Sequence, residues 1–314
     1  LTALAEGIGA RIEEDACLDL ARRLDATAAP KPASRPMPRP PFAARPRKLS
    51  VTRIETWVRD PYAIYAEYVL GLRPLEALSE GMDARDRGTM IHEAVERFAR
   101  RTDWSGDAYQ ALVECGEQVF GAAMDAPDVA WFWWPRFLRA ARWLAAQETA
   151  WRATREDNVI EEKREHRFAD VDFTLIGKPD RIDALKGGGL RIVDYKTGGV
   201  PTKKQVAAFM APQLPLLAAM ARAGAFGDAF RRPPDELAYA QLGGGKTEGQ
   251  LVTLDDPVAL TDALEANLKA RVRQFDSEAM PYAPRMAMEK LRYGGDYDHL
   301  SRFDEWGEAG EDEA

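Results

Sequence analysis

The sequence predicts an α/β domain with a mixed central sheet flanked by helices. Two observations indicate this fold class. Helical spacing of apolar residues predominates as far as residue 153, and apolar and polar residues alternate from Val159 onward. A helical stretch at 203–224 separates two groups of strands, and a further helix follows the last strand. Helices, then strands around a helix, then a final helix are typical of a layered α/β architecture.

The first expected helices have recognisable starts. Thr52 and Glu55 form a capping box, and Asp60 before Pro61 marks a second helix. A third helix is expected over 86–101. Its apolar stripe consists of Ile91, Val95 and Phe98.

The remaining elements follow from composition and period. The tryptophan-rich segment 129–153 predicts a buried helix broken at Pro135, and a surface that stacks on nucleobases is the less favoured alternative. Further helices are expected at 203–211, 213–224 and 257–275, and strands at 172–177, 181–185, 190–195, 236–242 and 250–254.

Composition and charge divide the chain into four parts. Residues 1–30 contain a short amphipathic helix, which we expect to be the last helix of a preceding domain. Residues 31–48 are rich in proline and carry only basic charges, which predicts an extended linker. The folded domain is expected at 49–306 and an acidic tail at 307–314. The net charge of −8 argues against a general binder of polyanions.

Several classes of protein are excluded by composition. The sequence lacks the roughly 18 consecutive apolar residues of a membrane span and the charged start and apolar core of a signal peptide. Two cysteines, Cys17 and Cys115, are too few for a disulfide framework or a four-thiolate metal site. We therefore expect a cytoplasmic protein with no membrane partner. Because residue 1 is leucine, we also expect the chain to be part of a longer polypeptide.

A β-hairpin over 177–199 carries charges where a buried strand pair should be apolar. If its turn centres on Gly187, Asp183 lies opposite Arg191 as an oppositely charged cross-strand pair. The same register places Asp180 opposite Asp194. Side chains alternate between the faces of a sheet, so both aspartates share one face with Lys196.

Two directly opposed carboxylates repel each other unless a cation lies between them. Mg²⁺ suits such a pair, because it prefers oxygen ligands and completes its shell with water and substrate phosphate. Lys196 would then face the attacking water or a scissile phosphate, as in a phosphodiester hydrolysis site. The alternative is a surface ladder of ion pairs at a strand end, which is common in proteins.

The linked motifs resemble a known family. The stretch "GKPDRID", followed by "DYKTG", is similar to the signature of PD-(D/E)XK nucleases, whose fold is restriction-endonuclease-like. The "GTMIH" upstream and "QLPLL" downstream resemble the RecB-type subfamily. Residues 47–75 and the late "YDHLSRFDEW" look like the C-terminal nuclease domain of AddB-type subunits, of the alphaproteobacterial kind, from AddAB helicase-nucleases.

The resemblance implies roles for individual residues. It implies a metal, Mg²⁺ or Mn²⁺ as a substitute, held by His92, Asp180 and Asp194, with the backbone carbonyl of Tyr195 as a further ligand. Lys196 would be the catalytic lysine beside Asp180 and Asp194. Gln213 would contact the DNA backbone or position Lys196.

The chain departs from the family pattern at two places. Leu217 stands where a tyrosine often follows the glutamine motif, so a DNA contact is lost or moved. Asp60 stands where many relatives have the first cysteine of an iron-sulfur cluster, and residues 280–300 contain no cysteine. We therefore predict no iron-sulfur cluster. Packing is expected to join the ends of the domain instead, through Tyr62, Tyr65, Tyr282 and Tyr293.

Three glutamates precede the strands, and their roles are open. We expect Glu161, Glu162 and Glu165 to form a solvated charged surface, with contact to the metal or to Lys196 as the alternative.

The resemblance also implies a function. It implies a Mg²⁺-dependent deoxyribonuclease, an exonuclease that processes DNA ends in double-strand break repair beside an AddA-type helicase-nuclease subunit. Its DNA would be a single strand or a duplex end, and residues 1–30 would end a helicase-like domain. The alternatives are a non-catalytic scaffold of the same fold that binds DNA ends or docks the helicase, and a free-standing nuclease.

Overall fold

The computed structural model describes residues 23, 33–74, 84–101, 106–243, 247–287 and 294–306. By internal contacts the chain divides into one unit at Pro36–Ser301 and another made of Leu1–Arg35 with Arg302–Ala314. The second unit contributes α12 (Phe303–Trp306). Apart from Arg23, the helix expected within 10–24 lies outside the described residues, as does the acidic tail. The sections that follow concern the unit from Pro36 to Ser301.

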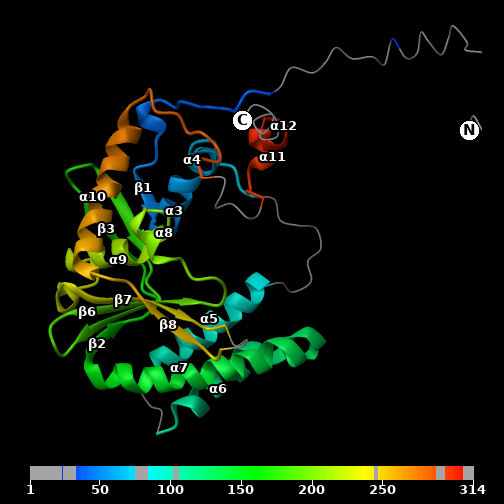
Figure 1. The fold of residues 1–314 in the computed structure, drawn as a ribbon, viewed down its shortest axis with the longest axis vertical. Coiled ribbons are helices and arrows are strands. Elements are labelled where there is room, and N and C mark those ends of the chain that lie inside the picture. The colour runs from blue at the N-terminus through cyan, green and yellow to red at the C-terminus, as the bar shows by residue number, and fades with distance from the viewer. Residues whose placement is uncertain are drawn as a thin grey trace, which may run out of the picture. The chain divides into compact units, whose positions relative to one another are not determined.

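A five-stranded mixed sheet forms the centre of this unit (Figure 1). Its strand order is β2 (Arg155–Val159), β5 (Arg181–Leu185), β6 (Leu190–Lys196), β7 (Pro234–Gln241) and β8 (Gln250–Thr253). Strands β6 and β7 run parallel and the other neighbours run antiparallel. The predicted α/β class with a mixed sheet is confirmed.

A second, three-stranded sheet was not expected. Its order is β1 (Lys48–Ser50), β4 (Phe173–Gly177) and β3 (Arg164–Phe168). Strand β1 runs parallel to β4, whereas β3 runs antiparallel to it. Strand β3 escaped prediction because only Phe168 of its five residues is buried, so it lacks the alternation that marks a half-buried strand.

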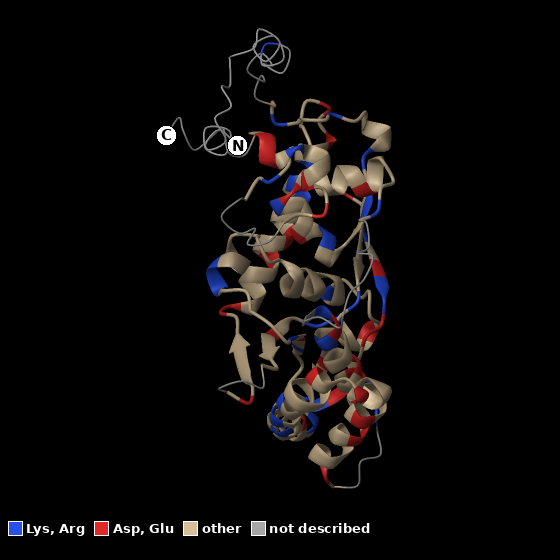
Figure 2. Ribbon diagram, turned by 90° about the vertical axis from the view of Figure 1, so that its right-hand side faces the viewer, with Lys and Arg blue, Asp and Glu red and all other residues tan. Residues whose placement is uncertain are grey.

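Helices cover both faces of the five-stranded sheet (Figure 1). One layer consists of α5 (Ala84–Arg100), α6 (Ala108–Phe120), η3 (Gly121–Asp125), η4 (Val129–Trp133) and α7 (Trp134–Thr154). The other side carries α3 (Val51–Arg59), α4 (Pro61–Ile64), η2 (Tyr65–Val69), α8 (Lys203–Ala207), α9 (Gln213–Arg222), η5 (Asp228–Phe230) and α10 (Pro257–Asp276). Each layer has its own hydrophobic core against the sheet. Acidic and basic residues are interspersed over both layers (Figure 2).

The start of α3 differs from the prediction. Ser50, rather than Thr52, is the N-cap, and its Oγ accepts a hydrogen bond from the Arg53 amide at 3.2 Å. Because Ser50 ends strand β1 in an extended conformation, the helix begins immediately after it. Glu55 is therefore released from the predicted capping box and instead pairs with Arg59, with 2.9 Å between Oε1 and Nη2.

The tryptophan-rich helix is mostly core, as predicted. A π-helical turn, η4, precedes α7, and Pro135 lies in the first turn of α7 without ending it. This position suits proline, since the first amides of a helix have no partner within the helix. Trp133 and Trp151 are buried, but Trp131 is 76% exposed and Phe132 is 60% exposed. For these two aromatic side chains the expectation of burial is wrong.

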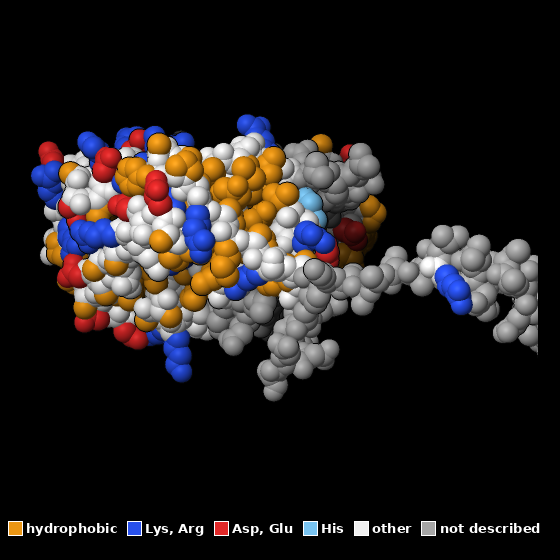
Figure 3. Space-filling model, turned by 90° about the horizontal axis from the view of Figure 1, so that it is seen from above, with side chains coloured by type: hydrophobic (Ala, Val, Ile, Leu, Met, Phe, Trp, Pro, Cys, Tyr) orange, Lys and Arg blue, Asp and Glu red, His pale blue; other side chains and the backbone are white. Residues whose placement is uncertain are grey.

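The described part of the proline-rich segment lies against the end of α10. From Pro36 onward it belongs to the same compact unit as the sheets. Buried Arg45 donates from Nη1 to the carbonyls of Phe275 at 2.7 Å and Met280 at 3.2 Å. The short helix η1 (Phe42–Ala44) precedes this arginine. Seen from above, this end of the molecule shows hydrophobic side chains with lysines and arginines among them (Figure 3).

The ends of the domain are joined by aromatic packing and by a polar contact. The Tyr62 and Tyr65 rings lie 5.7 Å apart, and the Tyr65 and Tyr282 rings 6.3 Å apart. Tyr293 lies outside the described residues. Asp60 Oδ1 accepts hydrogen bonds from the Ala63 amide, as a helix cap, and from the Arg285 amide, each at 3.3 Å.

Arg285 continues this contact to the last helix of the unit, α11 (Asp298–Ser301). Its buried guanidinium forms an ion pair with Asp298, and its Nε donates to Asp298 Oδ1 at 2.8 Å. Asp60 therefore bridges the first helices and the C-terminal segment at the position where the family pattern has a cysteine.

Within the described residues, no helix is long and apolar enough to cross a membrane.

Replacing Asp60 by alanine removes an acceptor shared by two backbone amides. Burial raises the pKa of this carboxyl, so its charge is not needed for stability near neutral pH. We expect Asp60→Ala to lower the free energy of unfolding by about 1–2 kcal/mol, and Asp60→Asn, which keeps an oxygen acceptor, to have a much smaller effect. Urea denaturation measures both, and equal losses would contradict the bridging role.

Candidate active site

The predicted register of the hairpin is confirmed. Strand β5 pairs antiparallel with β6, with Asp183 opposite Arg191 and Ile182 opposite Ile192. The turn between them uses Gly188 at φ +97°, a conformation that favours glycine. Asp180 lies immediately before β5, one residue beyond the last paired position.

Asp180 reaches across to the end of β6. Its Oδ2 accepts a hydrogen bond from the Tyr195 amide at 2.7 Å. The amide and carbonyl of one residue point the same way from a strand, so the Tyr195 carbonyl faces this side too. The Tyr195 side chain alternates to the opposite face, where it joins the core beneath α5–α7. The predicted backbone contribution of Tyr195 to a metal site stays a prediction.

His92 and Glu161 join Asp180 in one cluster. Each of the three residues offers a nitrogen or oxygen, and these atoms all lie within 4.8 Å of one another. Nδ1 of His92 is 3.8 Å from Oδ2 of Asp180. Burial lowers the pKa of His92, which favours the neutral imidazole that binds metals. This donor set, one imidazole and two carboxylates, fits a divalent cation.

A glycine one turn before His92 allows α5 to approach the site. A Cβ atom on Gly88 would lie only 3.1 Å from Thr197 Oγ1, just beyond the end of β6. The glycine of the "GTMIH" motif therefore allows close packing of the helix, whereas the histidine of the motif supplies the side chain that can bind a metal. The helix packs closely enough for His92, on the next turn, to reach Asp180.

Glu161 is a site residue that the sequence analysis left outside the predicted site, with contact to the metal or Lys196 only as the alternative. Its side chain is only 12% exposed and pairs with Lys178 at 2.5 Å, so the expected solvated surface is wrong for this residue. Glu161 has a φ of +53°, and its amide donates to the Pro179 carbonyl at 3.0 Å. Glu162 and Glu165 are more exposed and pair with Arg164 and Lys48. The run of charges "EEKRE" gave no signal that separates Glu161 from its neighbours.

Asp194 lies beside the cluster, between a lysine and an amide. Its Oδ2 is 2.7 Å from Lys196 Nζ, and its Oδ1 accepts a hydrogen bond from Gln213 Nε2 at 2.6 Å. Asp194 is 2% exposed and is not part of the three-residue group above. Its predicted role as a metal ligand therefore stays a prediction, and Gln213 contacts Asp194 directly.

The charges of this site affect one another. Burial raises the pKa of Asp180, and the charge of Asp194 raises it further. Burial also raises the pKa of Asp194, although Lys196 opposes this effect. For Lys196, burial lowers the pKa, but Asp194 outweighs burial, so the pKa is raised and the ammonium is retained.

Leu217 is part of the hydrophobic core. Its Cδ2 would lie 2.8 Å from a Cβ atom placed on Gly177 at the end of β4, and the side chain is almost fully buried. The position at which the family pattern has tyrosine is therefore used here for packing.

The opposite face of the hairpin carries a second ionic cluster, in which Arg181, Asp183 and Glu148 are fully buried. Arg181, which follows Asp180, forms an ion pair with Glu148 on α7 and donates from Nε to Asp183 at 2.8 Å. Arg152 and Arg155 contact the same Glu148 carboxylate at 2.7 and 3.1 Å. Burial raises the pKa of Glu148, but these arginines outweigh it and the pKa is lowered. The cluster anchors the start of β5, and with it Asp180, to the helix layer.

Comparison with known proteins identifies the class. The family described as the PD-(D/E)XK nuclease superfamily matches residues 48–287, and the chain belongs to this superfamily. The match includes every residue of the site described above.

Individual relatives are similar over part of their length. The chain is 30% identical over 177 residues to an uncharacterized protein of Rickettsia conorii, covering 54% of this chain and 21% of that protein. It is 29% identical over 201 residues to a subunit of the ATP-dependent helicase/deoxyribonuclease of Acetivibrio thermocellus, covering 54% of this chain and 17% of that protein. It is 30% identical over 179 residues to the subunit of the same name from Ruminiclostridium cellulolyticum, covering 48% of this chain and 15% of that protein. The chain thus spans about a fifth or less of these relatives.

Removing the charge of Glu148 breaks one of the two buried ion pairs of Arg181 and leaves Asp183 as its remaining carboxylate partner. We expect Glu148→Gln to lower the free energy of unfolding by about 3–5 kcal/mol. Glu156→Gln is the control, because Glu156 forms an exposed ion pair with Arg232 and should change stability by about 1 kcal/mol or less. Urea unfolding followed by circular dichroism gives both values. A loss for Glu148→Gln no larger than that of the control would contradict the anchoring role.

Proposed function

We propose that the chain is a metal-dependent DNA nuclease that hydrolyses phosphodiester bonds. The observation that carries the proposal is the His92, Glu161 and Asp180 cluster beside the Asp194–Lys196 ion pair. Membership of a nuclease superfamily supports it. A surface ladder of ion pairs would not require a histidine with a lowered pKa and two nearly buried aspartates in one place.

The donor set favours Mg²⁺, with Mn²⁺ as a substitute. Carboxylate and carbonyl oxygens suit both ions. We propose His92, Asp180 and Asp194 as ligands, as the family resemblance implies, with Glu161 as a further ligand and the Tyr195 carbonyl within reach. The bound metal would shield the phosphate charge and acidify the attacking water.

The chain's own residues perform the remaining tasks. Lys196 keeps its proton at Nζ and would offset the negative charge that develops on the phosphate oxygens. Gln213 holds Asp194 in place by its amide, and we propose that the same side chain lies along the DNA backbone. Both residues line the open cavities next to the site.

The substrate and the setting follow from the relatives. Subunits named as parts of an ATP-dependent helicase/deoxyribonuclease match this chain. We propose exonucleolytic processing of DNA ends in double-strand break repair, in the cytoplasm, with an AddA-type helicase subunit that supplies a single strand. Residues 1–30 would then end a helicase-like domain, and 31–48 would connect it to the nuclease domain.

Asp194→Ala and Lys196→Ala test the catalytic assignment. We expect each to lower the rate of single-stranded DNA hydrolysis in Mg²⁺ by at least about 100-fold, because charge stabilisation at the phosphate is lost. Lys203→Ala is the control, since Lys203 is exposed and pairs with Asp255. Unchanged hydrolysis in both site variants would falsify the assignment. DNA binding by the wild-type protein without hydrolysis would support the scaffold alternative.

Glu161→Gln tests the added metal ligand. We expect it to weaken Mn²⁺ binding by about tenfold or more, whereas Glu162→Gln, at the exposed neighbouring position, leaves it unchanged. Electron paramagnetic resonance of bound and free Mn²⁺ measures the affinity directly, without relying on nuclease activity. The same affinity in the two variants would show that Glu161 is not a ligand.

Many relatives have the first cysteine of an iron-sulfur cluster at the position of Asp60. The aspartate at this position leads to a prediction about iron. We expect the purified protein to be colourless and to contain no stoichiometric iron or sulfide. Iron analysis and the absorbance spectrum provide the measurement. A brown protein with iron bound in a fixed ratio would show that the prediction is wrong.

A further inference from the structure

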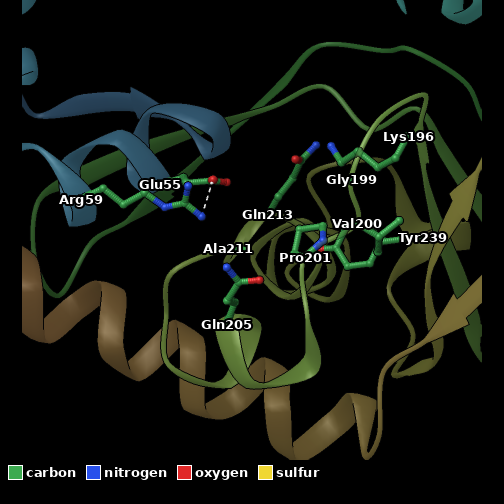
Figure 4. Close-up of a pocket in the computed structure, with 10 residues that line it drawn as sticks. All are labelled: Glu55, Arg59, Lys196, Gly199, Val200, Pro201, Gln205, Ala211, Gln213 and Tyr239. Atoms are coloured by element: carbon green, nitrogen blue, oxygen red, sulfur yellow. Dashed lines mark ion pairs between the residues drawn. The ribbon is translucent and has the colours of Figure 1, made fainter. Parts of the chain in front are cut away.

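A cavity of about 280 Å³ lies next to Lys196 (Figure 4). Its walls come from α3, from the loop that follows β6, from the start of α9 and from β7. The residues that line it are Glu55, Arg59, Lys196, Gly199, Val200, Pro201, Gln205, Ala211, Gln213 and Tyr239. Its volume is near the lower end of small-molecule pockets, about 300 Å³.

The cavity and the His92 cluster border two different hollows. His92, Glu161 and Thr197 line one of them, whereas Lys196 and Gln213 line the cavity, so the adjacent residues Lys196 and Thr197 face one hollow each. A phosphate held at Lys196 would therefore have one neighbouring nucleotide on the cavity side.

The walls combine the two kinds of contact that a nucleotide needs. Val200, Pro201 and Ala211 provide apolar surface against a base or sugar. Glu55 and Gln213 provide polar groups, and the Glu55–Arg59 ion pair forms one wall (Figure 4). The polar part of this lining is larger than the apolar part, as suits a ligand that carries sugar and phosphate oxygens beside a base.

Tyr239 gives an independent sign that the cavity holds a ligand. The residue is 1% exposed, and its hydroxyl has no hydrogen-bond partner among the described residues. Buried polar groups nearly always have a partner. Tyr239 lies opposite Asp194 on the neighbouring strand, and so on the same face of the sheet.

We propose that this cavity binds one unpaired nucleotide of the DNA strand, the one adjacent to the phosphate that is cleaved. The inference rests on the proposed nuclease function and deepens it. A cavity of about 280 Å³ is of a size to hold a single nucleotide. The site would therefore select a single strand, because a paired base has to leave its duplex before it can enter.

Two adjacent glycines allow a matched test. A Cβ atom at Gly199 or at Gly198 would meet no atom within 4 Å, so both positions accept a side chain without strain. Only Gly199 lines the cavity. We expect Gly199→Leu, in the intact protein, to lower the rate of single-stranded DNA cleavage by about tenfold or more, since even small misfits in a pocket have effects of this size. Gly198→Leu should remain within about twofold of wild type, as expected of a surface position.

An abasic substrate separates a filled cavity from a distorted loop. If the introduced leucine side chain occupies the space of a base, an oligonucleotide that lacks one base fits again, and cleavage by Gly199→Leu recovers at the bond next to the abasic position. Fluorescence anisotropy of a labelled oligonucleotide in EDTA provides a second readout, in which Gly199→Leu binds more weakly than Gly198→Leu.

The outcomes are distinct for the two proposals. Equal cleavage and equal binding by the two leucine variants would refute the nucleotide pocket and leave the nuclease function intact. A loss in Gly199→Leu with no recovery at any abasic position would also refute it, because the loop rather than a base would be the cause. A wild-type protein that fails to cleave DNA would refute the nuclease function, and the pocket proposal with it.

Discussion

The antiparallel pairing of β5 with β6 is the constraint on which the site depends. The turn at Gly188 and the Asp183–Arg191 pair fix the register of the two strands. A shift by one residue would send Asp194 to the opposite face, because side chains alternate along a strand. In the observed register, Asp180 and Asp194 end on the same side, at the point where the strands stop pairing. The chemistry of the site is therefore determined by a local hydrogen-bonding pattern.

Both faces of this strand pair are buried, and charges on both faces are compensated. On one face the buried aspartates are balanced by Lys196 and by the hydrogen bonds from Gln213 and the Tyr195 amide. On the other face Arg181 is enclosed by carboxylates, with Glu148 on α7 linking the strand to the helix layer. Charged groups that are removed from water require such partners. The two clusters hold adjacent residues, Asp180 and Arg181, so the anchoring of one fixes the position of the other.

Sequence patterns succeeded where the physics is local. The helix cap at Asp60 and the strands β4 to β8 follow from turn residues and from the alternation of apolar and polar residues. Sequence patterns failed at residues whose burial differs from what their type and their neighbours indicate. Strand β3 has one buried residue, and Ser50 became the helix cap because it also ends a strand that the sequence did not reveal. Glu161 was not distinguished from Glu162, since both stand in one charged run and only the turn after β2 makes one of them buried.

The sequence by itself determined the hairpin, its register and the grouping of Asp180, Asp194 and Lys196, because residues within about twenty positions are placed by strand geometry alone. Only the tertiary structure decided that His92 and Glu161 join Asp180, and that Gln213 meets Asp194. His92, on α5, is distant in the chain, and Glu161 and Gln213, although nearer, lie outside the β5–β6 hairpin. Their distances depend on how closely the helices pack on the sheet, as the close approach of Gly88 to Thr197 illustrates, and no local pattern contains that information.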